Sequence, residues 1–188
     1  MLVDCFQQHP KAILPVYATE NAACFDLHAA AFNSITERGI GEEIQTYAND
    51  VVTYSDAIVV DTGLVFMVPA GYGLFIFSRS GQIKEQVTLA NCVGVVDPDY
   101  RGTVKVVLRR NVTHSVVYDS VMASIGYSVV TQPLADELSS AINMHSVRVG
   151  DRVAQACLLP VPRCEFRAVS SVTSTARGTG GFGSTGVR

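Results

Sequence analysis

The sequence has little charge, no tryptophan and no long apolar run. Only 16% of its 188 residues are charged, and 14 Lys and Arg against 17 Asp and Glu leave a formal net charge of −3. A protein that binds nucleic acid through its overall field needs excess positive charge, so this balance argues against such a partner. Asp119 and several small polar residues interrupt the most apolar stretch, residues 116–130. A membrane span, which needs about 20 apolar residues, is therefore not predicted.

The chain also lacks a secretory signal pattern and any motif for disulfides or metals. Its first eleven residues show no positive start followed by an apolar block. The five cysteines form no CxxC pair, and an odd number cannot pair fully within one chain. The four histidines show no HxH or HExxH spacing. We therefore expect reduced, buried thiols in a cytoplasmic protein, and no metal site built by the protein itself.

Hydrophobic residues are plentiful, at 48% of the chain, so a sizeable core can form. Short apolar runs alternate with turns rich in Gly and Pro, and helices do not alternate with strands. The runs are 64–68 with a returning strand at 74–77, then 103–108, 146–149 and 153–159. This pattern predicts an all-β antiparallel barrel or sandwich and excludes a dinucleotide-binding sheet.

Two segments break the strand pattern. Residues 33–55 are irregular, and residues 112–145 contain a helical signal that begins at Pro133. Apolar residues recur at i, i+4 and i+8 from Leu134, and acidic residues lie in the first turn. We interpret both segments as insertions in a single β domain that spans residues 1–188, the second one carrying a short helix.

The C-terminal residues 174–188 are predicted to be a flexible arm. Five glycines among residues 177–186 allow backbone N–H groups to approach an anion, and Arg177 adds a guanidinium. Phe182, between glycines, fits stacking on a planar ligand. The GK[ST] ending of a Walker loop is missing. The alternative is a flexible end without a ligand.

Several polar residues follow apolar runs and are candidates for chemistry. Asp97 ends the run 93–96, where a carboxylate can orient and deprotonate a water, or can cap a turn. Tyr100 can pack on a sugar or cover the edge of the core. Arg79, with a serine and a glycine after it, suits phosphate oxygens, or lies in a solvated turn. Asp26, between apolar neighbours, needs a partner.

A turn near the end of the chain adds three polar side chains. Asp151 and Arg152 follow Gly150, and Gln155 lies three positions farther on. We interpret Asp151 and Arg152 as a structural ion pair and Gln155 as an amide that points outward.

Five of these segments, in this order, resemble the motifs of the trimeric dUTP nucleotidohydrolases (dUTPases). They are AACFDLHAA at 22–30, SRSGQ at 78–82, NCVGVVDPDYRG at 91–102, GDRVAQ at 150–155 and RGTGGFGSTG at 177–186. The resemblance implies a distorted jelly-roll-like β barrel and a homotrimer with active sites shared between chains. It implies hydrolysis of dUTP to dUMP and pyrophosphate, which limits uracil in DNA and supplies dUMP for thymidylate synthesis.

The resemblance also implies a role for each matched residue. Asp97 would activate the water that attacks the α-phosphorus in line, and Tyr100 would pack on the deoxyribose. The implied substrate-binding residues are Arg79, Ser80, Gly81, Asn91, Gly94, Val96, Tyr100, Gln155, Arg177, Phe182, Gly183, Ser184 and Thr185. Asp26 and Asp151 would support them. Mg²⁺ is the implied cofactor, held by the substrate phosphates and by waters.

The sequence departs from the family pattern at a few positions. Ser78 stands where proline is usual, and Gln82 stands where leucine is common. The long segment 112–145 is similar to bacteriophage forms, which would place the protein in a host cytoplasm.

Two other functions are compatible with this chain. The first is a bifunctional dCTP deaminase and dUTPase, against which the absence of an acid in residues 104–110 argues. The second is an interaction protein of the same fold that binds a protein partner through residues 112–145.

Overall fold

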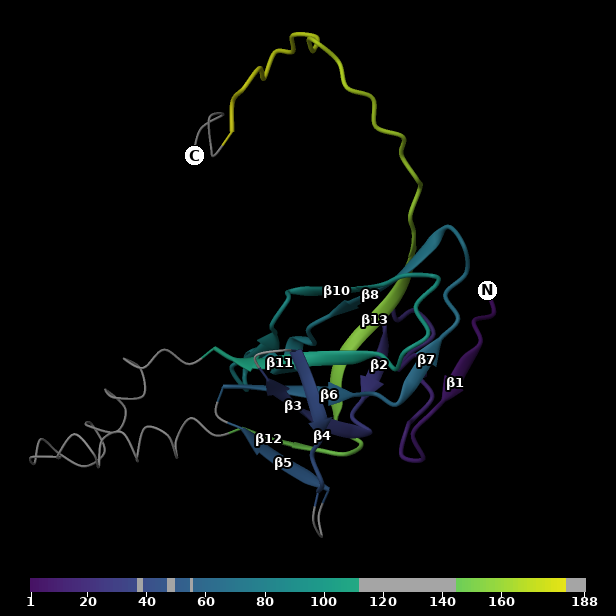
Figure 1. The fold of residues 1–188 in the computed structure, drawn as a ribbon, viewed down its shortest axis with the longest axis vertical. Helices are drawn as coiled ribbons and strands as arrows, with labels where there is room; N and C mark the ends of the chain where they lie inside the picture. The colour runs from purple at the N-terminus through teal and green to yellow at the C-terminus, as the bar shows by residue number, and fades with distance from the viewer. Residues whose placement is uncertain (37–38, 47–49, 55, 112–144, 182–188) are drawn as a thin grey trace, which may run out of the picture.

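The computed structural model describes residues 1–36, 39–46, 50–54, 56–111 and 145–181. Strands joined by turns and longer loops make up most of the described body of the protein (Figure 1). The strands are β1 (Cys5–Gln7), β2 (Phe25–His28), β3 (Ala31–Thr36), β4 (Gly39–Glu43), β5 (Val51–Tyr54), β6 (Ala57–Asp61), β7 (Leu64–Phe66), β8 (Tyr72–Phe77), β9 (Val87–Leu89), β10 (Val93–Val96), β11 (Lys105–Arg110), β12 (His145–Arg148) and β13 (Arg152–Pro160).

Within the described ranges, the one helical element is the 3-10 turn η1 (Ser80–Ile83). No helix of the described chain is long and apolar enough to cross a membrane. The short helix and the insertion were expected within residues 112–145, of which residues 112–144 lie outside the described part of the chain.

The strands pair antiparallel in two larger sheets and two smaller ones. The larger sheets have the strand orders β10-β8-β13-β2 and β4-β3-β6-β11-β9, and the smaller ones join β1 to β7 and β12 to β5. Many neighbours in these sheets, such as β2 and β13, are far apart in the sequence. Such crossovers are typical of Greek-key and jelly-roll barrels, and they confirm the all-β prediction.

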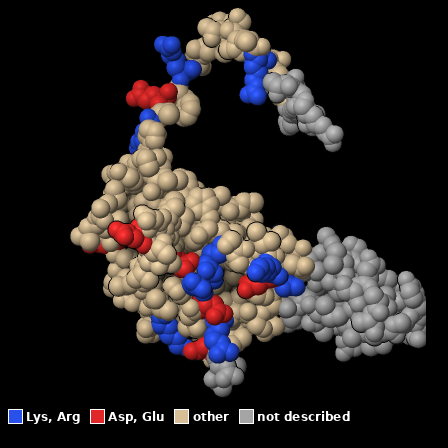
Figure 2. All heavy atoms as spheres, turned by 180° about the vertical axis from the view of Figure 1, so that it is seen from behind, with Lys and Arg blue, Asp and Glu red and all other residues tan. Residues whose placement is uncertain are grey.

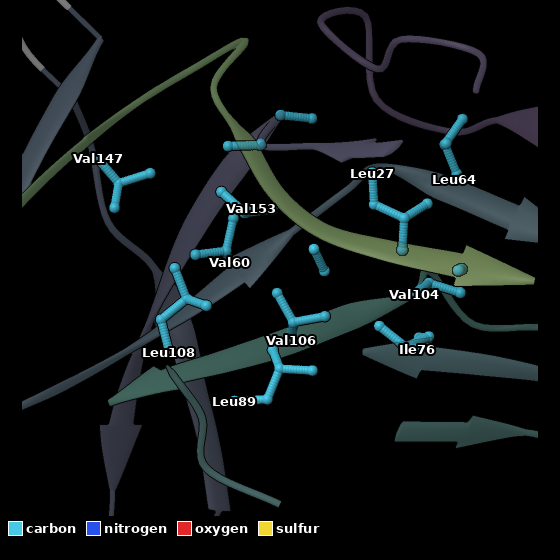
Figure 3. Packing of buried hydrophobic residues seen from close by; sticks show 14 of the residues in the cluster. Leu27, Val60, Leu64, Ile76, Leu89, Val104, Val106, Leu108, Val147 and Val153 are labelled. Atoms are coloured by element: carbon cyan, nitrogen blue, oxygen red, sulfur yellow. The ribbon is translucent and has the colours of Figure 1, made fainter. Parts of the chain in front are cut away.

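Apolar side chains from both larger sheets meet in one core, where Figure 3 shows them pointing toward one another. Leu74 and Ile76 on β8 are buried, whereas Phe75 and Phe77 are only partly buried, as expected where one face of a strand points inward. Val106 on β11 lies opposite Val60 on β6, and both are buried. Full burial of each such side chain stabilises the folded protein by roughly 1.5–3 kcal/mol. The core therefore fixes β8, on which the candidate site is built.

Three expectations from the sequence were wrong. Strand β8 does not return along β7, because β7 pairs with β1 whereas β8 pairs with β10 and β13. Residues 33–55 are not irregular throughout, since they include most of β3 and all of β4 and β5. Two thiols, Cys92 and Cys164, are exposed rather than buried. The interpretation of 33–55 as an insertion stays a prediction.

Residues 161–181 leave the body after β13 and run away from it (Figure 1). Nearly all of these residues are exposed, including the ring of Phe166, which is 98% exposed. This segment therefore adds little to the core of its own chain.

Candidate functional site

The antiparallel pair β8–β10 separates two groups of candidate residues. Val93 lies opposite Phe77, and Val96 lies opposite Leu74. Arg79 follows the Phe77 end of the pair, and Asp97 follows the other end. At about 3.3 Å per residue, their backbones are roughly 15–20 Å apart.

At the first end, Asp26 bridges two guanidinium groups. Its Oδ1 accepts a hydrogen bond from Arg79 Nε at 2.7 Å, and its Oδ2 lies 3.5 Å from Arg152 Nη1. Arg79 also donates from Nη1 to the Arg152 carbonyl at 3.4 Å. We call Asp26, Arg79 and Arg152 the arginine cluster. Two cations against one carboxylate leave it positive, as an anionic ligand requires.

Two glutamines hold the backbone of the arginine cluster in place. Gln82, which is only 4% exposed, accepts from the Arg79 N–H at 2.8 Å and donates to the Val153 carbonyl at 2.8 Å. Gln155 donates from Nε2 to the Ser78 carbonyl at 2.9 Å. These bonds tie the segment after β8 to β13, so Arg79 and Arg152 keep a fixed relation.

The arginine cluster borders a cleft of about 260 Å³ whose lining includes Gln82, Glu85, His145 and Asp151. His145 Nε2 lies 3.8 Å from a Glu85 oxygen, and its ring meets Tyr54 edge to face. Burial lowers the pKa of His145, although Glu85 opposes the shift. The imidazole is therefore largely neutral near pH 7, so the charge at this end comes mainly from the arginines.

At the second end, Asp97 lines a separate cleft of about 280 Å³. Its lining residues are Ile40, Val95, Val96, Asp97, Tyr100, Val104 and Lys105, and none of them lines the cleft beside the arginine cluster. We call this the Asp97 cleft. The described part of the chain gives the Asp97 carboxylate no hydrogen bond or ion pair. It is exposed and able to accept a proton from a water.

A rigid turn presents Asp97 and Tyr100. The Tyr100 N–H donates to the Asp97 carbonyl at 3.2 Å, and Arg101 Nη1 donates to the Pro98 carbonyl at 2.7 Å. Tyr100 Oη donates to the Thr103 carbonyl at 3.1 Å and fixes the ring. Any Cβ at Gly102 would collide with that hydroxyl. Glycine is therefore needed there for the ring to fold back over the turn.

Strand β10 runs along the edge of its sheet and links Asn91 to Asp97. Asn91 is exposed, and Cys92 after it has a positive φ of 62° that turns the chain into the strand. A Cβ at Gly94 would lie 3.2 Å from Ile76 Cβ, closer than most such contacts. Glycine lets the backbone approach β8 closely at this point. The edge exposes backbone groups of β10, which suit the reading of a planar ligand by hydrogen bonds.

Several side chains predicted for the site lie elsewhere or make other contacts. Gln155 is half-buried and bonded to Ser78, so it does not point outward. Asp151 is not paired with Arg152 among the described contacts, because its carboxylate accepts from the Arg148 N–H at 2.8 Å. Ser80 and Gly81 are exposed on η1. Arg177 lies on the exposed segment away from the body.

The candidates Phe182, Gly183, Ser184 and Thr185 lie outside the described residues. Sequence reasoning missed Arg152 and Gln82 as parts of the site. The signal for Arg152 was its place in the segment 150–155. The signal for Gln82 was an amide at a position where the family commonly has leucine.

Comparison with known proteins identifies the family. The family model described as dUTPase matches residues 10–121, more than half of the chain. A deoxyuridine 5′-triphosphate nucleotidohydrolase of Dinoroseobacter shibae is 36% identical over 174 residues, which cover 92% of this chain and 87% of that protein. One from Helicobacter pylori strain P12 is 32% identical over 180 residues, 95% of this chain and 92% of that protein.

The chain belongs to the dUTPase family. This membership confirms the predicted enzyme class, a dUTP diphosphatase, which is a hydrolase of nucleotide metabolism. A solved structure of the Staphylococcus bacteriophage 80alpha dUTPase with dUPNHPP matches with a TM-score of 0.70 over 99% of each chain, at 17% identity. A variant dUTPase from phage phi11 of S. aureus, described with a structural Mg(II) ion, matches with a TM-score of 0.61 at 17% identity, over 91% of this chain and 98% of that one. These likenesses confirm the predicted dUTPase-type fold.

Proposed function

We propose that this dUTPase hydrolyses dUTP to dUMP and pyrophosphate with Asp97 as the general base. The supporting observation is the Asp97 cleft, where a carboxylate without a partner among the described residues lies beside an aromatic ring on a rigid turn. Asp97 would take a proton from the water that attacks the α-phosphorus. The bond between the α-phosphorus and the oxygen that bridges it to the β-phosphate then breaks, and pyrophosphate leaves with the negative charge that develops on this oxygen.

The nucleoside would lie along β10. Exposed backbone groups between Asn91 and Val96 would read the edge of uracil, and a narrow approach there would exclude the methyl group of thymine. Tyr100, whose hydroxyl is held by Thr103, would pack on the deoxyribose and leave no room for a 2′-hydroxyl. This order puts the α-phosphorus at the Asp97 end of the strand.

The phosphate-binding residues of the same chain would then lie at the end of β10 opposite to Asp97, too far from the phosphates to bind them. Arg79 follows the end of β8 that pairs with Val93, so it is near the base end of β10 and distant from Asp97. We infer that each active site combines the Asp97 cleft of one chain with the arginine cluster of another. Ser80, Gly81 and Gln155 would accompany that arginine cluster. This division supports the predicted homotrimer.

The exposed segment after β13 fits the predicted arm. Arg177 would reach the phosphates, and Phe182, Gly183, Ser184 and Thr185 would close over the bound nucleotide. Closure of such an arm excludes water and orders the substrate.

The residues present fit a Mg²⁺ ion that arrives on the triphosphate. In the described ranges, no group of three His, Cys, Asp or Glu side chains lies together as a metal site. Asp26 is already engaged by two arginines. Mg²⁺ commonly keeps its waters and binds through substrate phosphates. When bound, the ion would neutralise charge on the leaving pyrophosphate.

The direct test is pyrophosphate release from dUTP, compared with dTTP, dCTP and UTP, with and without Mg²⁺. We expect fast release from dUTP alone and strong dependence on Mg²⁺. Ammonia release from dCTP would instead indicate the deaminase, which β11 (Lys105–Arg110), with no acidic residue, disfavours. Equal turnover of all four nucleotides would contradict the proposed base pocket. A viral source and a protein partner for residues 112–145 stay predictions.

A further inference from the structure

Two cysteines lie at the end of the paired region of β2 and β13. The register places Gln155 opposite Asp26 and Ala156 opposite Phe25, the first residue of β2. Continuing this register by one residue places Cys24, just before β2, opposite Cys157 on β13. Directly opposite residues in an antiparallel pair have Cα atoms about 4.5–5.5 Å apart. A disulfide bridges Cα atoms about 4.4–6.8 Å apart, a range that includes the spacing of directly opposite residues.

The alternation of side chains along the two segments places both thiols on the same side of the sheet. Both are half-buried, on the face that also carries Asp26 and Gln155. Burial, followed by the charge and the hydrogen bond of Cys24, raises the pKa of the Cys157 thiol. Both cysteines are reduced in this structure. This pair is therefore a dithiol that is already assembled.

The other cysteines compete poorly for this pairing. Cys5 lies on β1 opposite Phe66 of β7, so it is not opposite either of these two thiols. Cys92 and Cys164 are exposed and lie outside the β2–β13 pair.

We propose that Cys24 and Cys157 form a reversible intrachain disulfide across β2 and β13 when the protein meets a peroxide. Hydrogen peroxide oxidises one thiolate to a sulfenic acid. The second thiol then attacks that sulfur, the S–S bond forms, and water leaves. Two thiols and one peroxide thus give one disulfide and two waters. A dithiol reductant reverses the bond by thiol–disulfide exchange.

The bond would form near the arginine cluster. Two rungs away on the same face of the sheet, Asp26 lies opposite Gln155, and these residues hold Arg79 and the Ser78 carbonyl. A disulfide here would oppose local separation of β2 from β13. It would also restrict the unfolded chain, because the two cysteines are far apart in the sequence.

The experiment uses the full chain with Cys92→Ser and Cys164→Ser, which leaves three thiols. After treatment with hydrogen peroxide at about pH 8, where more of the thiol is ionised, we expect the count of free thiols to fall from three to one. Peptide mapping should find Cys24 joined to Cys157. The thermal unfolding midpoint should rise by about 5–15 °C and return after dithiothreitol.

Matched variants separate this bond from other oxidations. Adding Cys5→Ser should leave bond formation intact, whereas adding Cys24→Ser should abolish it. The proposal is overturned if the mapped bond contains Cys5, if the products are only sulfinic acids, or if every disulfide joins two chains. Because the readouts are thiols and midpoints, failure here leaves the proposed hydrolysis untouched.

Discussion

At the scale of single residues, the aspartate carboxylates differ in the hydrogen bonds and ion pairs that they make. Asp61 is engaged by Lys105, by the Thr103 hydroxyl and by the Gly63 N–H. Asp26 is engaged by Arg79 and Arg152. Asp97 has no such partner within the described chain and opens into a cleft. A general base needs free lone pairs, which separates Asp97 from the structural carboxylates.

Asp97→Asn should remove turnover while the protein still folds and binds dUTP. An amide keeps the shape of the side chain but cannot take the proton, so kcat should fall by about 10²-fold or more. Steady-state kinetics and dUTP titration would measure this. Asp99→Asn, an exposed change in the same turn, is the control and should act like wild type. An unchanged kcat for Asp97→Asn would refute the assigned base.

Gln82→Leu should weaken both stability and substrate binding. The change leaves the Arg79 N–H and the Val153 carbonyl without their side-chain partner. Each unsatisfied buried group costs about 1–3 kcal/mol, so the free energy of unfolding should fall by that order. The KM for dUTP should rise because Arg79 loses its support.

Chemical unfolding and kinetics would check this prediction. The control Gln86→Leu makes the same change at an exposed position and should shift the free energy of unfolding by less than about 0.5 kcal/mol. Equal effects of the two substitutions would show that the hydrogen bonds of Gln82 contribute nothing.

At the scale of elements, the described ion pairs form small mixed groups of charge. On the face seen in Figure 2, Lys and Arg side chains of the body lie next to Asp and Glu side chains. The arginine cluster is one such group, with Asp26 between its guanidinium groups. Local pairing of this kind suits one bound anion better than a long polyanion.

Deletion of residues 174–188 should abolish hydrolysis and leave the unfolding midpoint within about 2 °C of wild type. Residues 174–181 are nearly all exposed and belong to no strand, so their loss removes no core contact. Circular dichroism and pyrophosphate release would measure the two effects. A large drop in the midpoint would mean that the arm is part of the folded core, and full activity would mean that it does not close the site.

At the scale of the whole molecule, the proposed catalytic and phosphate-binding residues lie at the two ends of one strand pair. The edge strand β10 also exposes apolar side chains, with Val93 and Val95 at 40% and 56%. An edge strand with exposed apolar side chains favours association with another chain over exposure to solvent. Both features support the proposal that the active site is shared between chains.

Mixed assemblies should regain activity that neither parent has. Asp97→Asn and Arg79→Ala should each be inactive alone, since every site lacks one group. After the two chains are unfolded together and refolded in equal amounts, about a quarter of the sites should combine an intact Asp97 with an intact Arg79. Pyrophosphate release from dUTP would report this recovery.

The mixing experiment also has a clear failure. If both groups acted from one chain, no mixture would contain a complete site, and activity would stay at the level of the parents. Size-exclusion chromatography of each sample confirms that assembly took place.

The sequence predicted the positions of several strands well, but it predicted poorly which strands pair with each other. The runs at 74–77, 103–108 and 153–159 overlap β8, β11 and β13, because continuous apolar residues between turns are a local signal. Strand β4 was missed because it contains two glycines and two glutamates and is mostly exposed. Strand β5 was missed because it has only four residues, too few for a clear periodicity. The return of β8 along β7 was wrong because closeness in sequence does not decide which strands pair.

The sequence by itself determined the family, through five ordered motifs, and with it the enzyme class and the residues to consider. Only the tertiary structure decided that Asp26 bridges Arg79 and Arg152, that Gln82 is a buried support, and that Asp97 lies at the opposite end of β8–β10. The physical reason is that a motif is a local stretch of sequence, whereas contacts between distant residues depend on the register of the paired strands. Register is fixed by burial of the core, which no single segment contains.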